Sequence, residues 1–228
     1  MNRNQLAARI EHTNLKPAAT AEDIKRLCEQ AKEYGFAVVC VAPFRVQEAA
    51  EYLKDSSVRL TTVVGFPYGF SLTKIKVEEA LAAVRAGATD IDMLMNLGAF
   101  ADKNYSLVEQ DIRQVAEAIK QISQQRVLKV IIEPGLWTEA EKVRAAQIVK
   151  RSGADYVKTS TGLVKGSKAE VSDVRLLRRV VGQNFGVKAS GGIRTFDQAV
   201  ALVKAGADRL GTSHALEILH GKQATGNY

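Results

Sequence analysis

Residues 151–159 read RSGADYVKT, and the same kind of corner recurs as RAGATDIDM at 85–93 and KAGADRLGT at 204–212. Each copy ends a helical pattern with a basic residue and a glycine, and then begins a strand-like run. A basic residue is favourable at the negative C-terminal end of a helix, and glycine readily adopts the left-handed conformation that closes it. The three copies therefore predict a helix-to-strand connection that the chain uses repeatedly.

Short apolar runs and helical patterns alternate along the whole chain. We expect strands at 10–14, 36–42, 59–66, 90–95, 127–133, 155–160, 186–190 and 208–213. We expect helices at 21–34, 74–86, 105–122, 138–151, 168–181, 195–204 and 213–219, with one further short helix at the N-terminus. Alternating strands and helices form parallel sheets.

Eight strands in a chain of 228 residues predict an α/β protein, a single-domain (β/α)₈ TIM barrel that spans residues 1–228. Residues 220–228 are expected to form a flexible C-terminal tail. An open, doubly wound sheet is the alternative. No Gly-x-Gly-x-x-Gly motif follows the first strand to favour that alternative.

The composition is that of a soluble globular protein, with 46% hydrophobic and 25% charged residues. No apolar run approaches the roughly 20 residues of a membrane span, and the N-terminus lacks the apolar core of a signal peptide. The only two cysteines, Cys28 and Cys40, make a disulfide framework unexpected. We therefore expect a cytoplasmic protein with no membrane partner.

The net charge of +7 arises from 32 basic and 25 acidic residues, and the basic residues are spread along the chain. Their densest cluster, Arg175, Arg178 and Arg179, lies on a predicted helix and fits a solvated face. Basic and aromatic residues do not interleave as they do where proteins stack nucleic-acid bases. A basic protein that attracts a small anionic substrate fits better than a nucleic-acid partner.

Two lysines, Lys158 and Lys188, end short apolar runs at positions where a strand is buried. Burial lowers the pKa of an ammonium group, and a second positive charge nearby lowers it further. A neutral lysine can attack a carbonyl carbon and form a Schiff base. Alternatively, either lysine reaches solvent or pairs with a carboxylate. The occurrence of two such lysines, followed by TSTG and SGG, favours catalysis.

Asp92 lies in the middle of the predicted strand DIDMLM, on the same face as Asp90. A buried carboxylate requires a partner, and Lys158 or Lys188 can supply one. Asp92 could then hold a water molecule and move protons. The alternatives are a purely structural ion pair for Asp92 and a capping or solvated role for Asp90 at the strand entry.

Glycine-rich segments follow the last three predicted strands, with Arg194 and Ser213 beside them. Backbone amides in such loops bind phosphate, and barrel phosphate sites often use the loops after strands 7 and 8. Tight turns also require glycine, which is the alternative explanation. We expect the substrate and its phosphate to contact the following residues: Gly162, Gly191, Gly192, Arg194, Gly211, Ser213, Cys40 and Lys129.

The three histidines, His12, His214 and His220, are isolated and lack the spacing of zinc ligands. Neither a metal nor an organic cofactor is therefore expected. Cys40 is flanked by apolar residues, as in a core, although its strand also places it to line a pocket.

Several segments resemble the 2-deoxyribose-5-phosphate aldolases, in order and over about residues 10 to 219. They are EHTNLKPAAT, VVCVAPFRV, TTVVGFPYG, KVEEALAAVRAGATDIDMLMNLGAF, LKVIIE, GADYVKTSTG, VKASGGIRT and RLGTS. The resemblance implies a class I aldolase that needs no metal and is often a homodimer. Such enzymes cleave 2-deoxy-D-ribose 5-phosphate to D-glyceraldehyde 3-phosphate and acetaldehyde.

The resemblance also implies roles for individual residues. Lys158 matches the Schiff-base lysine, Lys188 the lysine that perturbs it, and Asp92 the aspartate of a proton relay. The phosphate region is matched by Gly191, Gly192 and Ser213. Some members end in a tyrosine that assists proton transfer, which Tyr228 would match, the alternative being a disordered terminus.

The sequence departs from the family pattern at four places. Glu11 replaces a customary aspartate near the relay, and the other departures are EPGLW at 133–137, LVKGSKAEV from Leu163, and GTSHA around His214. The alternatives are thus a Schiff-base aldolase for a different phosphorylated or unphosphorylated aldehyde, and a barrel that only binds. Retention of both lysines and Asp92 argues against the second alternative.

Overall fold

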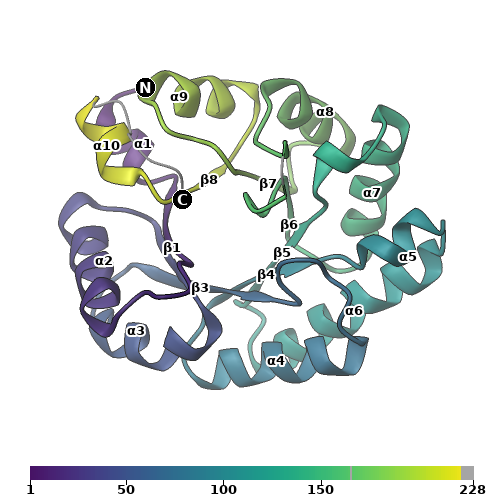
Figure 1. Ribbon diagram of the computed structural model, residues 1–228, viewed down its shortest axis with the longest axis horizontal. Helices are drawn as coiled ribbons and strands as arrows, with labels where there is room; N and C mark the ends of the chain where they lie inside the picture. The colour runs from purple at the N-terminus through teal and green to yellow at the C-terminus, as the bar shows by residue number, and fades with distance from the viewer. Residues whose placement is uncertain (165, 222–228) are drawn as a thin grey trace.

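The structure, a computed structural model, describes residues 1–164 and 166–221. Its parallel strands form a closed barrel in chain order from β1 to β8, and β8 pairs with β1 (Figure 1). The strands are β1 (Ile10–Asn14), β2 (Val38–Val41), β3 (Arg59–Val64), β4 (Asp90–Leu94), β5 (Val127–Ile131), β6 (Tyr156–Lys158), β7 (Gly186–Ser190) and β8 (Arg209–Thr212). The predicted (β/α)₈ barrel is confirmed, and the open sheet is excluded.

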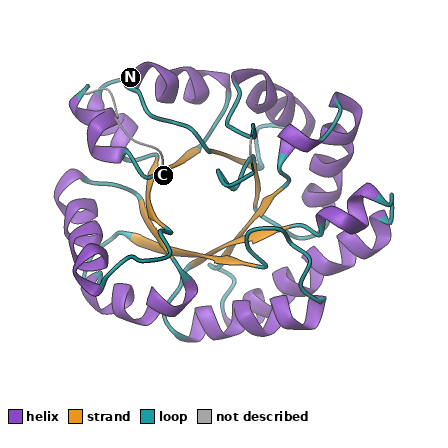
Figure 2. Cartoon of the chain, in the orientation of Figure 1, coloured by secondary structure: helices purple, strands orange, loops and turns teal. Residues whose placement is uncertain are grey.

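Helices surround the strands (Figure 2). Buried apolar side chains from both layers form the core between them. The helices are α1 (Arg3–Ala7), α2 (Ala21–Tyr34), α3 (Val46–Tyr52), α4 (Thr73–Arg85), α5 (Leu97–Ala101), α6 (Tyr105–Ile122), α7 (Glu139–Arg151), α8 (Val171–Val181), α9 (Phe196–Ala205) and α10 (Ala215–His220). Two short 3₁₀ turns, η1 (Pro43–Arg45) and η2 (Pro134–Leu136), follow β2 and β5.

The three copies of the repeated corner each make the same kind of hydrogen bond, which explains why the pattern recurs. The glycines at its centre have positive φ angles of 115°, 83° and 116°. Two positions later, Thr89 Oγ1, Asp155 Oδ2 and Asp208 Oδ2 each accept a backbone N–H from the preceding strand or its start, at 3.0, 2.8 and 2.8 Å. The corner therefore turns the chain and also satisfies a donor of the strand beside it.

Two helices of the structure were not predicted, and two predicted helices begin two or more residues later than expected. Helices α3 and α5 were not expected because 7 and 5 residues are too short to display a helical period. The helix predicted at 168–181 begins only at Val171. Residues before it stay extended, and the Ala169 N–H donates to the Gly191 carbonyl at 2.9 Å. The helix predicted at 213–219 begins at Ala215 and ends at His220.

The C-terminal prediction is only partly covered by the structure. His220 belongs to α10 rather than to a tail, whereas residues 222–228, including Tyr228, lie outside the described residues.

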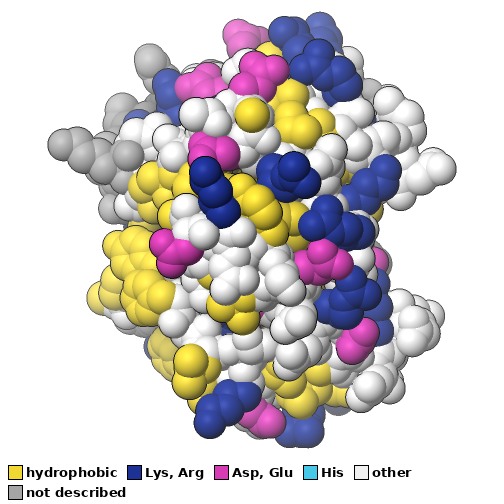
Figure 3. Space-filling view, turned by 90° about the vertical axis from the view of Figure 1, so that its right-hand side faces the viewer, with side chains coloured by type: hydrophobic (Ala, Val, Ile, Leu, Met, Phe, Trp, Pro, Cys, Tyr) yellow, Lys and Arg dark blue, Asp and Glu magenta, His cyan; other side chains and the backbone are white. Residues whose placement is uncertain are grey.

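None of the helices in 1–164 and 166–221 is long and apolar enough to cross a membrane. Basic and acidic side chains lie among one another on the face of the molecule drawn in Figure 3.

Candidate active site

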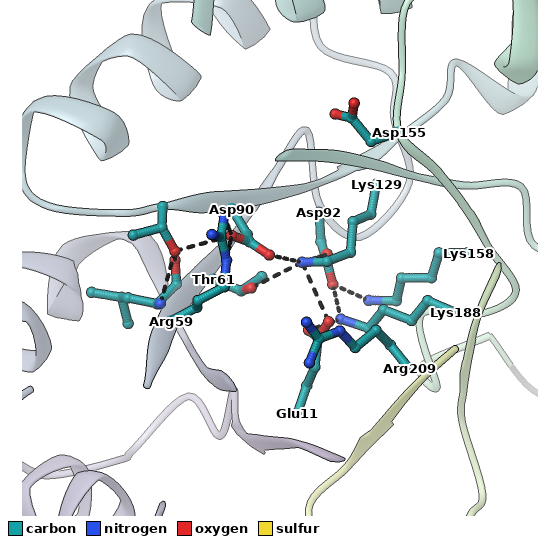
Figure 4. A network of polar contacts seen from close by, with 12 residues as sticks. Glu11, Arg59, Thr61, Asp90, Asp92, Lys129, Asp155, Lys158, Lys188 and Arg209 are labelled. Carbon is teal, nitrogen blue, oxygen red and sulfur yellow. Dashed lines mark hydrogen bonds and ion pairs between the residues drawn. The ribbon is translucent and has the colours of Figure 1, made fainter. Parts of the chain in front are cut away.

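Charged side chains from five strands converge inside the barrel, although they are far apart in sequence (Figure 4). They are Glu11 on β1, Asp92 on β4, Lys129 on β5, Lys158 on β6 and Lys188 on β7, and each is at most 5% exposed. Alternate residues of a strand point to the same face, and closure of the barrel turns these faces toward a common interior. The predicted burial of the lysines is thus observed.

Asp92 lies at the centre of this cluster. Its Oδ2 accepts hydrogen bonds from Lys158 Nζ and Lys188 Nζ, both at 2.6 Å, and its Oδ1 lies 3.4 Å from Lys129 Nζ. Glu11 forms a second bridge, since one carboxylate oxygen pairs with Lys188 and the other lies 3.4 Å from Lys129. Glutamate in place of the family's customary aspartate therefore reaches Lys188 directly.

Asp90 is part of the same network. It is 2% exposed, lies 2.9 Å from Lys129 Nζ, and accepts a hydrogen bond from Arg59 Nε at 2.7 Å. The idea that Asp90 only caps or solvates the strand entry is wrong, because Arg59 and Lys129 enclose it. Lys129 also donates to Thr61 Oγ1 at 3.0 Å, so side chains from β1, β3 and β4 all contact this ammonium.

Burial and neighbouring charges shift the pKa values of the three lysines in different directions. Burial, reinforced by the Lys188 ammonium, lowers the pKa of Lys158 despite its contact with Asp92. Burial acts the same way on Lys188, but Asp92 and Glu11 outweigh it and raise its pKa. Carboxylates likewise outweigh burial and raise the pKa of Lys129. Burial alone would raise the pKa of Asp92, yet the three surrounding ammonium groups hold it below its usual range.

Among the described residues, these ion pairs join four cationic side chains to three carboxylates: Arg59, Lys129, Lys158 and Lys188 with Glu11, Asp90 and Asp92. The three lysines and the three carboxylates are buried and equal in number, whereas the Arg59 side chain is 34% exposed. The lowered pKa of Lys158 therefore follows from its own burial and from the Lys188 ammonium.

A cavity of about 570 Å³ opens onto this cluster from the carboxyl ends of β6, β7 and β8. Lys158 and Lys188 form part of its wall, together with Cys40. Burial raises the pKa of the Cys40 thiol to about 11, so this side chain is a thiol at neutral pH. The predicted loop residues that line the cavity are Gly162, Gly191, Gly192, Arg194, Gly211 and Ser213.

Part of the cavity lining carries positive charge and glycine turns. Gly191 and Gly192 turn there with φ of 96° and 72°, and the cationic residues Lys168 and Arg194 line the same cavity. Position 211 is also tightly enclosed, since an added Cβ would lie 3.0 Å from Ser190 Cβ and 3.2 Å from Lys188 Cε. The wall of this one cavity therefore contains glycine turns, cationic side chains and an amine of lowered pKa.

Comparison with known proteins agrees with this geometry. The sequence model of the DeoC/LacD family aldolases matches residues 7–221. The chain belongs to this aldolase family. A deoxyribose-phosphate aldolase of Aciduliprofundum boonei is 52% identical, over 96% of this chain and 97% of the relative. The aldolase is therefore an enzyme of the lyase class.

Two further relatives extend the comparison. A deoxyribose-phosphate aldolase of a Geobacillus species is 50% identical, over 99% of both chains. Among solved structures, the deoxyribose phosphate aldolase from Aeropyrum pernix, described as a tetramer, has a TM-score of 0.89 at 35% identity. That match covers 96% of this chain and 91% of the relative.

The predicted residues of the aldolase fall into two groups. The first group lines the cavity, whereas Glu11 and Asp92 lie behind the two cavity lysines and contact them. Lys129, which was predicted to contact the substrate, does not line the cavity and pairs with these two carboxylates instead. Sequence reasoning missed Arg59 and the role of Asp90. The alternation in RLTTVV and DIDML, which puts Arg59 with Thr61 and Asp90 with Asp92, was the available signal.

Proposed function

We propose that this aldolase reversibly cleaves 2-deoxy-D-ribose 5-phosphate to D-glyceraldehyde 3-phosphate and acetaldehyde, through a Schiff base on Lys158. One observation carries the proposal. Within the described part of the chain, Lys158 is the one lysine that both lines the cavity and has a lowered pKa. The name that its relatives share, deoxyribose-phosphate aldolase, supports the choice of substrate.

The chemistry follows from the placement of the amine. Neutral Lys158 Nζ adds to C1 of the open-chain sugar, and loss of water gives an iminium ion. The C3 hydroxyl then loses its proton, and the C2–C3 electron pair flows into the iminium. D-glyceraldehyde 3-phosphate leaves, and an enamine remains on Lys158. Protonation of C2 and hydrolysis of the imine release acetaldehyde.

Asp92 and Lys188 are the proposed partners in proton transfer, since Asp92 contacts both Lys158 and Lys188 at 2.6 Å. Glu11 holds Lys188 from the other side and keeps its ammonium in place. The role of Tyr228 stays a prediction, because that residue lies outside the described residues. We further propose that the sugar phosphate binds at the Gly191–Gly192 turn, and that the enzyme self-associates as its Aeropyrum pernix relative does.

The decisive experiment is reduction of the enzyme with borohydride in the presence of acetaldehyde, followed by peptide mass spectrometry. We expect an ethyl group on Lys158, because borohydride reduces a Schiff base to a stable secondary amine. Modification confined to exposed lysines would show that the proposed mechanism is wrong. The same experiment on the Lys142→Met variant, which removes a lysine paired with Asp173 outside the cavity, should give the same label on Lys158.

Lys188→Met should move the acidic limb of the kcat/KM profile to higher pH. The Lys188 ammonium opposes protonation of Lys158, and its loss also leaves Asp92 and Glu11 with fewer cations to balance them. Both effects raise the pKa of Lys158. A higher pKa means less neutral amine, so kcat/KM at pH 7 should fall by at least about tenfold. An unshifted acidic limb would contradict this electrostatic role.

A further inference from the structure

One carboxylate in the turn after β5 holds the segment that follows β6, of which residues 159–164 and 166–170 are described. Glu133 is fully buried and has a left-handed backbone, with φ of 51°. Its carboxylate accepts the Thr161 N–H at 3.0 Å and the Ser167 hydroxyl, and its own N–H donates to the Thr159 carbonyl at 2.9 Å. The side chain thus holds that segment at two points that are six positions apart.

The close contact with Ser167 is possible because the turn after β5 contains a small residue, Gly135. A Cβ added to Gly135 would lie 2.9 Å from Ser167 Oγ and 3.0 Å from Ser167 Cβ, closer than side chains pack. Ser167 Oγ also lies 3.4 Å from Ser160 Oγ. Ser167 falls in LVKGSKAEV, a stretch where this sequence departs from its family pattern, whereas Glu133 ends LKVIIE, a segment that resembles it.

The same segment also contacts the Gly191–Gly192 turn, where we propose that the phosphate binds. The Ala169 N–H donates to the Gly191 carbonyl at 2.9 Å. A Cβ added to Gly192 would lie 3.3 Å from Lys168 Cβ. Lys168 itself is paired with Glu170 at 3.2 Å and is largely exposed, so only its backbone is held. The segment is therefore fixed between the Glu133 carboxylate and the Gly191–Gly192 turn.

This segment forms much of the cavity wall, including Thr161, Gly162, Ser167 and Lys168. We propose that Glu133 and Ser167 are positioning residues that set the affinity of the enzyme for the phosphate end of its substrate. They hold Gly162 and Lys168 at the distance from the Gly191–Gly192 turn that a phosphate group requires. This inference rests on the proposed function, and it concerns binding at a point remote from the reacting carbon.

The effect of breaking this contact follows from where the phosphate lies. A contact that stabilises the bound substrate and the transition state equally raises KM when it is lost and leaves kcat nearly unchanged. We expect this pattern here because the phosphate group keeps its charge and its bonds throughout the reaction. Ser167→Ala removes one donor to Glu133. We expect KM for 2-deoxy-D-ribose 5-phosphate to rise about tenfold, with kcat within about twofold of wild type. KM for unphosphorylated 2-deoxy-D-ribose should not change.

Two variants control for structural damage. Glu133→Gln should retain most of the affinity, because its amide oxygen can accept the Thr161 N–H and its amide nitrogen can donate to Ser167 Oγ. Ser152→Ala removes an equally buried serine hydroxyl, which donates to the Ile148 carbonyl at 2.6 Å on α7, away from the cavity. It should leave KM for both sugars unchanged.

Binding of glycerol 3-phosphate, measured by calorimetry, separates this inference from the proposed reaction. This compound has a phosphate but no carbonyl, so it binds without forming a Schiff base. We expect Ser167→Ala to weaken it about tenfold, whereas trapping of acetaldehyde on Lys158 stays as in wild type. A second result would be that wild type traps no acetaldehyde while Ser167→Ala still binds glycerol 3-phosphate more weakly than wild type does. That result would support the positioning role and contradict the Schiff-base reaction. Unchanged binding of glycerol 3-phosphate, or equal rises in KM for both sugars, would overturn the positioning role.

Discussion

Lys158→Met is expected to slow sugar-phosphate cleavage by about 10⁴-fold or more, the scale on which loss of a covalent nucleophile acts. Methionine retains most of the length of lysine and its apolar stem but has no amine. Asp92 keeps its contact with Lys188, so the interior remains paired and the protein should fold. The rate is measured with a coupled assay for D-glyceraldehyde 3-phosphate, and folding by thermal unfolding.

Lys158→Arg is the matched control for this prediction. Arginine keeps the positive charge opposite Asp92, but its guanidinium does not deprotonate in proteins and cannot form a Schiff base. Both variants should therefore be inactive and should give no borohydride adduct at position 158. A rate within about tenfold of wild type in either variant would show that another group is the nucleophile.

Asp92→Asn is expected to reduce both stability and rate. Asp92 is the carboxylate that Lys158, Lys188 and Lys129 share, and all four groups are buried. Removal of one partner from a buried ion pair typically costs about 3–5 kcal/mol in the free energy of unfolding. Loss of a group that moves protons lowers kcat by about 10²–10⁴-fold. Urea denaturation and steady-state kinetics measure the two effects.

A partly exposed surface carboxylate provides the comparison for Asp92. Glu109 pairs with Arg113 and Arg151 at 2.6 Å on the surface, where both arginines are nearly half exposed. Because solvent screens such pairs, Glu109→Gln should change the free energy of unfolding by less than about 1 kcal/mol and leave kcat unaltered. If Asp92→Asn behaved like Glu109→Gln, the central place assigned to Asp92 would be wrong.

The fold followed from local patterns because each strand and most helices carry a period that short stretches display. The corner at 151–159 identified three helix ends and three strand starts, and alternation placed Asp90 with Asp92 before any contact was known. Helices α3 and α5 are too short for such a signal. The late start of α8 depends on a hydrogen bond to Gly191, which local sequence does not contain.

The candidate site divides in the same way. Lys158 and Lys188 stand out in the sequence because each is a charged residue that ends an apolar run. Glu133 also ends an apolar run, but Ser167 has no such mark, and nothing in the local sequence pairs the two. Their contact joins loops that follow different strands, at a separation of 34 residues. The cavity likewise exists only because the loops after β6, β7 and β8 meet at one end of the barrel.

The sequence by itself determined the barrel, the order of its strands and the groups available for chemistry, because these depend on local periodicity and on residue type. Only the tertiary structure decided which lysine can be neutral. The pKa of each lysine depends on its distance from carboxylates on other strands, and Glu11 and Lys188, which pair directly, are 177 residues apart. Lys188 lies between two carboxylates and Lys158 beside one, so the pKa is raised for Lys188 and lowered for Lys158.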